Sequence, residues 1–369
     1  MKIAINCRSF LLKEHTGIGR YAFHLVHSLS QIDFTNEYLL YVQKGFFDTR
    51  RKIPKIKAKN FSVKWDAFNL GIEKTVGEAD IYHSPSFDDL RIKGPKIIVT
   101  VHDLVFRAFA QGHTKETIAT SEQQLKETVA KAERIICCSR STYKDLLRWT
   151  NFDPAKLRLI YQGVERKDFY RLNEEETEVA ARWLSLKGIR PPFLLFVGTI
   201  EPRKNLQNLL KAYSLLRHEG RFSGPLVVIG RAGWMSEDVS RILADEGLKE
   251  DVRFMGFVSN EELRYFYNLC EVFIFPSFFE GFGFPILEAL SCGAAVVTSN
   301  VSSCPEVAGD AAILADPNQP ISIAEAIDGL LKNEALKKQL QVRALKRAEE
   351  FSFEKTARET LGVYEEFRK

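Results

Sequence analysis

The chain has 369 residues, of which 45% are hydrophobic and 27% are charged, and its formal net charge is only +4. Its length exceeds the roughly 300 residues at which a single core stops growing, so we expect two domains. The composition excludes disordered and fibrous proteins, and so small a net charge gives no indication of nucleic-acid binding.

No apolar run reaches the roughly 18 residues that a membrane-spanning helix needs. Lys2 and Arg8 interrupt the N-terminal stretch where a secretory signal is apolar, so we expect a cytoplasmic protein. The six cysteines have neither metal nor redox spacing, and we expect them to be reduced packing residues.

Short apolar runs alternate with helix-length stretches along the chain. In the first half the runs fall at residues 2–6, 38–42, 97–101 and 134–138. After a charged helical stretch at 173–187, a second series falls at 193–198, 226–230, 252–256, 272–276 and 294–299. Strands that alternate with helices form βα units around a parallel sheet, so we predict an α/β protein with two doubly wound Rossmann-like domains.

We place these domains at residues 1–170 and 171–351. The last segment, residues 352–369, has the apolar spacing of an amphipathic helix and no strand after it. We expect this helix to pack back against the first domain. Open α/β sheets bind ligands beyond the carboxyl ends of their strands, so we expect the chemistry in a deep cleft across which the two domains face each other.

The excess positive charge is concentrated in residues 44–74, where nine basic and three acidic side chains give a net charge of +6. Aromatic residues, among them Phe46, Phe47 and Trp65, are interleaved with the basic ones. Such a composition is typical of a surface that touches a bilayer without spanning it. We expect reversible contact with an anionic membrane, and an ordinary solvated surface is the alternative.

The most informative stretch is PSFFEGFGFPILEALSCG at residues 276–293. Its turn of Gly281, Phe282, Gly283 and Phe284 leads into a helix, and a glycine-rich turn at a helix N-terminus is suited to bind phosphate. Two carboxylates bracket the turn: Glu280 precedes it, and Glu288 follows within the helix. The alternative is a helix capped by glycines with two solvated glutamates.

Two cations, Arg203 and Lys204, follow a predicted strand and precede Asn205, a residue that favours the helix N-cap. Cations at this edge of a sheet are suited to a nucleoside diphosphate, and arginine adds bidentate geometry. Ordinary solvated loop charges are the alternative.

The stretch GIGRYA at residues 17–22 predicts a flexible turn of Gly17 and Gly19 before a helix that starts near Tyr21. It also satisfies a loose dinucleotide-binding pattern. Its glycines come about ten residues after the first strand ends, and no acidic residue directly follows the second strand, which argues against NAD.

The stretch at 276–293 resembles the signature of the retaining family 4 glycosyltransferases of the GT-B fold. Residues 197–213 and 302–317 resemble further motifs of that family, while 17–22 and 101–104 resemble its bacterial mannosyltransferase subgroup. These motifs follow the family's order from residue 17 to residue 317. The resemblance implies an acceptor-side N-terminal domain and a C-terminal domain that binds a nucleotide sugar.

The resemblance also implies roles for individual residues. It assigns Arg203 and Lys204 to diphosphate binding and leaving-group stabilisation, and it places His102 under the donor sugar. A satisfied structural histidine is the alternative for His102. Glu280 would orient the sugar, and Glu288 would contact a sugar hydroxyl.

The remaining donor contacts implied by the family come from loops. Gly17 and Gly19 would belong to a loop that closes over the diphosphate. Gly230, Arg231 and Val258, at two strand ends, would form the slot for the base. No Asp-x-Asp sequence occurs, so we expect neither a metal-bridged diphosphate nor any cofactor.

We therefore expect a retaining hexosyltransferase, with GDP-mannose as donor and a lipid-linked or other glycan of a bacterial surface polysaccharide as acceptor. The acceptor-binding residues are not indicated by the sequence. A UDP- or dTDP-sugar donor is one alternative, and a nucleotide-sugar epimerase or phosphorylase of the same fold is another. A glycoside hydrolase that uses Glu280 and Glu288, and a non-catalytic nucleotide-binding partner, are the remaining alternatives.

Overall fold

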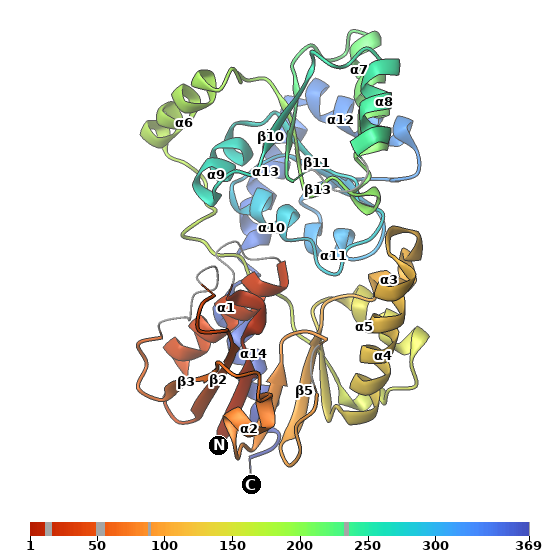
Figure 1. Cartoon of the computed structure of the whole chain (residues 1–369). Helices are drawn as coiled ribbons and strands as arrows, with labels where there is room; N and C mark the ends of the chain where they lie inside the picture. Colours follow the sequence, from red (N-terminus) through yellow and green to blue (C-terminus); the bar gives the residue numbers. More distant parts are fainter. Residues whose placement is uncertain (12–16, 49–55, 88–89, 232–235, 369) are drawn as a thin grey trace. The chain divides into compact units, whose positions relative to one another are not determined.

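The computed structural model describes residues 1–11, 17–48, 56–87, 90–231 and 236–368. The chain forms two compact units (Figure 1). The first unit comprises residues 1–163 together with 351–369, and the second comprises 164–350. The first unit thus ends at Gly163, before the boundary at residue 170 expected from the sequence.

The first unit is built on a seven-stranded parallel sheet in the order β3-β2-β1-β4-β5-β6-β7. Its strands are β1 (Lys2–Asn6), β2 (Glu37–Gln43), β3 (Phe61–Asp66), β4 (Ile81–Ser84), β5 (Lys96–Val101), β6 (Arg134–Cys137) and β7 (Leu157–Leu159). Its helices are α1 (Gly17–Ile32), α2 (Ile72–Val76), α3 (Val105–Ala108), α4 (Lys115–Lys131), α5 (Arg140–Trp149) and α14 (Phe353–Glu365), with short 3-10 turns at Arg8–Phe10, Ala110–Gly112 and Pro154–Lys156.

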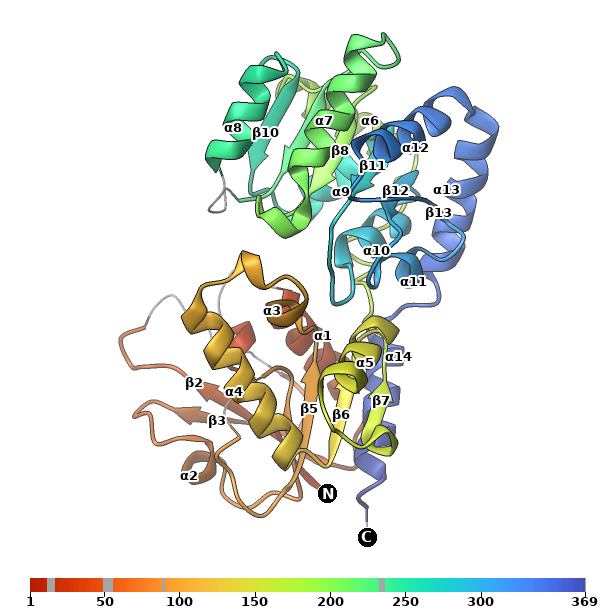
Figure 2. The ribbon, with the colours of Figure 1, turned by 90° about the vertical axis from the view of Figure 1, so that its right-hand side faces the viewer.

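Side chains that alternate along each strand form two hydrophobic layers in this unit. On one face Ala4, Leu39 and Val99 pack with Leu125 of α4. On the other face lie α1 and the C-terminal helix α14, which contact each other, and Figure 2 shows α4 on the side of the sheet opposite α1. The C-terminal segment is therefore part of the first unit, since α14 completes one of its two helical layers.

The second unit has a six-stranded parallel sheet in the order β10-β9-β8-β11-β12-β13. Its strands are β8 (Leu194–Val197), β9 (Leu226–Ile229), β10 (Val252–Gly256), β11 (Val272–Phe275), β12 (Val296–Ser299) and β13 (Ala312–Ala315). Its helices are α6 (Glu174–Leu186), α7 (Leu206–His218), α8 (Ser236–Asp245), α9 (Asn260–Leu269), α10 (Phe284–Ser291), α11 (Cys304–Ala308), α12 (Pro320–Lys332) and α13 (Glu334–Ala348), with a 3-10 turn η4 at Pro202–Lys204.

Helices cover both faces of this second sheet. Leu209 of α7 and Ile327 of α12 join the core layer of Phe196 and Val297 on one face. On the other face, the ring of Tyr267 from α9 meets the ring of Phe273 edge-on. Two doubly wound α/β units are thus present, and the fold class predicted from the sequence is confirmed.

Two further findings concern the environment of the chain. All six cysteines are free and buried, as expected of packing residues. Within the described ranges, none of the helices combines the length and the apolar character that a membrane crossing demands.

Candidate functional site

The basic turn and the acidic residue predicted to act together are in direct contact in the second unit. Arg203 and Lys204 lie in η4, at the carboxyl end of β8. Arg203 Nη1 donates to Glu280 Oε2 at 2.8 Å, and Lys204 Nζ donates to Glu280 Oε1 at 2.6 Å. Arg203 also donates to the carbonyl of Phe279 at 2.8 Å and to Glu201 Oε1 at 2.5 Å. Each oxygen of the Glu280 carboxylate therefore holds one cation.

Burial and charge act in opposite directions on this carboxylate. Glu280 is only 7% exposed, and burial by itself raises the pKa of a carboxyl group. The charges of Arg203 and Lys204 outweigh burial and lower the pKa of Glu280 to about 2. Burial lowers the pKa of Lys204, whereas the charge of Glu280 opposes that change. The site therefore contains an ionised carboxylate at neutral pH, with two cations fixed by it.

The glycine-rich turn is held from behind by a second loop. Gly283 has φ of +112° and caps the start of α10, whose first turn contains Pro285. Ser302 Oγ accepts from the Glu280 amide at 3.0 Å. Ser303 Oγ lies 2.9 Å from the Glu280 carbonyl and 2.7 Å from the Phe282 carbonyl. The loop after β12 thus fixes the backbone that carries both Glu280 and the turn.

Glu288 points from α10 into the interior. It is 2% exposed, and its Oε2 accepts from the Tyr267 hydroxyl at 3.1 Å. Since Glu280 and Glu288 are both buried, the alternative of two solvated glutamates is wrong. The contact of Glu288 with a sugar hydroxyl stays a prediction.

The structure corrects the expectation that Asn205 caps the helix that follows it. Asn205 precedes α7, but its side chain makes no capping bond, because its backbone is left-handed with φ of +61°. Instead its Nδ2 donates to the carbonyls of Pro276 at 2.9 Å and Pro317 at 2.7 Å. Asn205 therefore ties the basic turn to the loops that follow β11 and β13.

The residues expected at the nucleotide base lie at the carboxyl ends of neighbouring strands. At Gly230 a β-carbon would lie 1.9 Å from the carbonyl oxygen of Gly198, so only glycine permits this approach of the loops after β8 and β9. The guanidinium carbon of Arg231 lies 5.4 Å from the centre of the Phe257 ring, which is largely exposed. Val258, half-buried, follows directly.

In the first unit, the structure corrects the expectation for Gly17 and Gly19. Both belong to the first turn of α1, which begins at Gly17, four residues before the expected start near Tyr21. The low helix propensity of glycine is a weak preference, and the packing of the buried Gly19 overrides it. Residues 12–16, immediately before them, lie outside the described residues.

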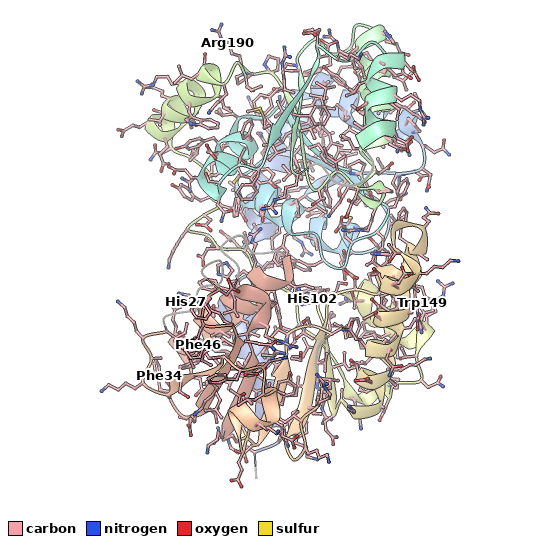
Figure 3. The ribbon with its side chains drawn as sticks, in the orientation of Figure 1. His27, Phe34, Phe46, His102, Trp149 and Arg190 are labelled. Atoms are coloured by element: carbon pink, nitrogen blue, oxygen red, sulfur yellow. The ribbon has the colours of Figure 1, made fainter. Side chains whose placement is uncertain are left out.

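His102 follows β5 in the first unit (Figure 3). Its Nε2 lies 2.7 Å from the carbonyl oxygen of Pro85, and its Nδ1 lies 2.8 Å from Nε2 of Gln162. Its own carbonyl accepts from Thr142 Oγ1 and Cys138 Sγ, each at 2.9 Å. Burial lowers the pKa of His102. A sugar hydroxyl could reach the ring nitrogens only by sharing or replacing these partners, which the sequence did not indicate.

Sequence reasoning missed several residues that surround Glu280 and His102. Ser302 and Ser303 stood within the motif at 302–317, but nothing in their spacing indicated that they hold the turn. Gln162, a polar residue beside Gly163 just after a short apolar strand, was a weak signal at a sheet edge. Within the described ranges, no group of three His, Cys, Asp or Glu side chains could hold a metal ion.

In comparisons with known proteins, a different family profile matches each half of the chain. The family profile of glycosyl transferases group 1 matches residues 182–347, and that of glycosyltransferase family 4 matches residues 16–168. The O-antigen chain mannosyltransferase B of Escherichia coli is 32% identical over 95% of this chain and 96% of its own. The serotype-specific mannosyltransferase WbdA of E. coli is 34% identical over 62% of this chain but only 28% of its own length.

Solved structures show the same fold at lower identity. Sucrose-phosphate synthase from Thermosynechococcus elongatus has a TM-score of 0.79 at 20% identity, covering 99% of this chain and 98% of its own. Anabaena HepE in complex with UDP and glucose has a TM-score of 0.77 at 15% identity, covering 99% and 100%. WaaG, a glycosyltransferase involved in lipopolysaccharide biosynthesis, has a TM-score of 0.72 at 14% identity, covering 98% and 99%.

Proposed function

We propose that this chain, which belongs to the family 4 glycosyltransferases of the GT-B fold, transfers mannose from GDP-mannose to a glycan hydroxyl with retention of configuration. Similarity over nearly the full length to an O-antigen chain mannosyltransferase supports the sugar and a role in bacterial surface polysaccharide synthesis. The observation that carries the proposal is the buried contact of Arg203 and Lys204 with Glu280 beside the glycine-rich turn.

The contact of the two cations with Glu280 suits them to a diphosphate. Because the carboxylate already holds both cations in place, little side-chain freedom is lost when an anion binds them. A diphosphate that arrives at this cluster meets one arginine fork and one ammonium group. The amide end of α10, beside the turn at Gly283, adds the favourable end of a helix dipole.

In the proposed reaction, the bond between the sugar carbon and the phosphate oxygen breaks while the acceptor oxygen bonds to the same face of that carbon. The acceptor's proton passes to the departing phosphate oxygen, which leaves as the nucleoside diphosphate. Arg203 and Lys204 stabilise the charge that develops on that phosphate, which is the main catalytic contribution. The ionised Glu280 orients the sugar and screens its positive charge.

The base has a candidate platform in the same unit. The guanidinium of Arg231 and the exposed ring of Phe257 lie against each other at the carboxyl ends of β9 and β10. Flat groups of this kind stack on a nucleobase, and nearby backbone groups at Gly230 and Val258 can hydrogen-bond its edge. UDP- and dTDP-sugars remain the alternative donors.

The chain is further proposed to work at the cytoplasmic face of a membrane, where a lipid-linked acceptor is available. Of the basic segment, Arg50, Arg51, Lys52 and Lys55 lie outside the described residues. The described part supports a surface contact, because Phe47 is 98% exposed and the ring of Phe46 contacts the rings of Trp65 and Phe68 at 5.0 and 5.5 Å.

A direct assay tests the proposed function. The protein is incubated with radiolabelled GDP-mannose and a mannose-terminated oligosaccharide, with UDP-glucose and dTDP-glucose as parallel donors. We expect labelled product from GDP-mannose alone. The product's NMR spectrum should show an α-linkage, the same configuration as in the donor. Cleavage of glycosides without nucleotide would support the hydrolase, and conversion of the donor sugar without an acceptor would support the epimerase.

A thermal-shift screen of GDP, UDP, dTDP and ADP identifies the base independently of any acceptor. A ligand at 100 times its dissociation constant stabilises a protein by about 2.7 kcal/mol, which raises the melting temperature visibly. We expect GDP to give the largest shift. An equal or larger shift with UDP would reject the proposed donor and retain the glycosyltransferase.

A further inference from the structure

Gln162 is buried against His102. Gln162 is 1% exposed, and its Nε2 lies 2.8 Å from Nδ1 of His102. On the other side of the ring, Nε2 of His102 lies 2.7 Å from the carbonyl oxygen of Pro85. A carbonyl can only accept, so Nε2 of His102 carries a proton, and an amide NH₂ can only donate, so Nδ1 does not. The two contacts together define one neutral tautomer.

We propose that Gln162 is a positioning residue for the glycosyl transfer, and that it keeps His102 a neutral imidazole with its proton on Nε2. This inference rests on the proposed function and on the place that the family resemblance implies for His102, beneath the donor sugar. The sugar carbon gains positive charge as its bond to phosphate breaks. An imidazolium beside it would repel that charge, whereas a neutral imidazole would not.

The orientation of the Gln162 amide determines the protonation state of His102. With the amide reversed, Oε1 would face Nδ1, which would then need a proton, and the ring would become a cation because Nε2 is already protonated. In the observed orientation, Oε1 of Gln162 is buried without a hydrogen-bond partner among the described atoms. An unpaired buried acceptor costs free energy, so among the side-chain contacts described for Gln162 only the one to His102 favours this orientation.

Both neighbours of Gln162 are fixed to the C-terminal segment. The carbonyl of Tyr161 accepts from Thr356 Oγ1 at 2.7 Å. At Gly163 a β-carbon would lie 2.1 Å from the backbone nitrogen of Phe353, so the two chain segments cross here in direct contact. The first unit ends at Gly163 and resumes at residue 351. Gln162 thus connects His102 to the point at which the chain leaves and re-enters this unit.

The charged and titratable groups around His102 favour the neutral ring on balance. Burial lowers the pKa of His102, and the hydrogen bond to the Pro85 carbonyl and the charge of Asp103 oppose this. His83 is itself held neutral, since burial and the proximity of His102 lower its pKa to about 3. The ring of Tyr21 meets the imidazole edge-on at 5.0 Å, and Cys138 donates to the His102 carbonyl. Among the groups described here, only Asp103 carries a charge that favours an imidazolium.

The test combines a spectroscopic and a kinetic measurement. The protein is labelled with ¹⁵N-histidine, and the signal of His102 is assigned by its loss in His102→Asn. The seven histidines give few enough signals for this assignment. We expect the wild-type His102 to show the Nε2-protonated neutral tautomer throughout pH 6 to 8. A doubly protonated ring or the Nδ1-protonated tautomer at pH 7 would overturn the proposal without any variant.

Gln162→Glu places an acceptor at Nδ1 and is expected to convert His102 to the imidazolium. We expect kcat at pH 7 to fall at least tenfold and to recover as the pH rises and the ring loses its proton, while GDP still shifts the melting temperature. Gln162→Leu, which lacks any partner for Nδ1, should lower kcat without that recovery. If His102 stays neutral in Gln162→Glu, the amide does not set its protonation and the proposal fails.

The chain offers a matched control at an exposed site. Gln31 Nε2 lies 3.1 Å from a ring nitrogen of His27, so Gln31→Glu makes the same chemical change away from the site. We expect it to leave kcat and its pH profile unchanged. If His102 shows the expected spectra but His102→Ala transfers mannose normally, Gln162 sets the tautomer of His102 but has no positioning role in the transfer, and that part of the proposal fails while the proposed function stands.

Discussion

At the scale of the residue, Glu280 determines the charge of the site. Its two carboxylate oxygens hold Lys204 and Arg203, and these cations lower its pKa to about 2 despite its burial. The sequence indicated all three residues through their family resemblance. It could not indicate their contact, because 76 positions separate Lys204 from Glu280 and only the folded sheet brings them together.

Glu280→Gln should lower kcat by about 100-fold or more and change nucleotide affinity little. The substitution keeps the shape of the side chain but removes the charge beside the sugar, and it turns an amide NH₂ toward one of the two cations. Glu288→Gln should instead weaken donor binding as well. Glu271→Gln, at a carboxylate paired with Lys337 in the same unit, is the control and should be silent in activity. Near wild-type turnover of Glu280→Gln would show that its role is misassigned.

Lys204→Ala should cost about 2 to 4 kcal/mol of transition-state stabilisation, because it removes one donor to the developing phosphate charge. Lys337→Ala is a matched control, since the side chains of Lys204 and Lys337 are both 12% exposed and both ion-paired.

Since protein cations rather than a metal are proposed to hold the diphosphate, EDTA should leave kcat/KM of the wild type nearly unchanged. Complete inhibition by EDTA that Mg²⁺ reverses would contradict this proposal.

At the scale of the element, the sequence predicted most strands, including the largely exposed β10, and missed β3, β4, β7 and β13. The runs that became β8 and β11 are buried at every position. β3 is an edge strand with partly exposed residues, and β4, β7 and β13 have only three or four residues each. Polar residues interrupt the apolar run in β3, β4 and β7, and β13 is an edge strand of four residues, so pairing with their neighbours is what reveals these strands.

The connections between elements were harder to predict than the elements. Asn205 has a residue type that favours the helix N-cap, but the left-handed backbone turns its side chain toward two loops instead. Local propensity describes the helix that follows Asn205, whereas the bonds to Pro276 and Pro317 depend on chain segments far away in the sequence. The glycine-rich turn depends in the same way on Ser302 and Ser303.

Asn205→Asp should lower the free energy of unfolding by about 3 kcal/mol in urea titrations, because it removes two buried donors and sets a carboxylate against two carbonyls. Asn205→Gly tolerates the positive φ, so it should lose only the hydrogen bonds and cost less than Asn205→Asp. If the side chain capped α7, aspartate would replace asparagine with almost no loss, since both residues favour the N-cap. Equal stability of Asn205→Asp and the wild type would therefore restore the capping interpretation.

At the scale of the whole molecule, the first unit is discontinuous in sequence. Residues 351–369 return to it after the second unit is complete, and α14 packs against α1. Glu366 fixes the end of this segment by accepting from Arg134 Nε at 2.6 Å and from Arg158 Nε at 2.7 Å. The buried His83 bonds to the Tyr364 hydroxyl at 2.6 Å. Because the last residues complete the first core, the first unit depends on the full length of the chain.

The exposed aromatic residues of the first unit allow a test of the proposed membrane contact. Phe46 and Phe47 follow the carboxyl end of β2, whereas Phe34, also exposed, precedes the amino end of the same strand, and Figure 3 labels Phe34 and Phe46. Near an anionic membrane each lysine or arginine contributes about 1 kcal/mol, so the net charge of +6 in residues 44–74 is enough for reversible adsorption. This attraction should weaken as salt shortens the Debye length.

We therefore expect the protein to sediment with vesicles of phosphatidylcholine and phosphatidylglycerol but not with phosphatidylcholine alone, and to be released by roughly 0.5 M salt. Replacement of Arg50, Arg51, Lys52, Lys55 and Lys57 by serine should abolish this binding. Phe47→Ser should weaken binding about tenfold or more, because inserting one aromatic side chain into the interface is worth roughly 1.5 kcal/mol. Phe34→Ser, at the opposite end of β2, should bind like the wild type. Equal recovery in the supernatant with both vesicle types would make residues 44–74 an ordinary solvated surface and would favour a soluble acceptor.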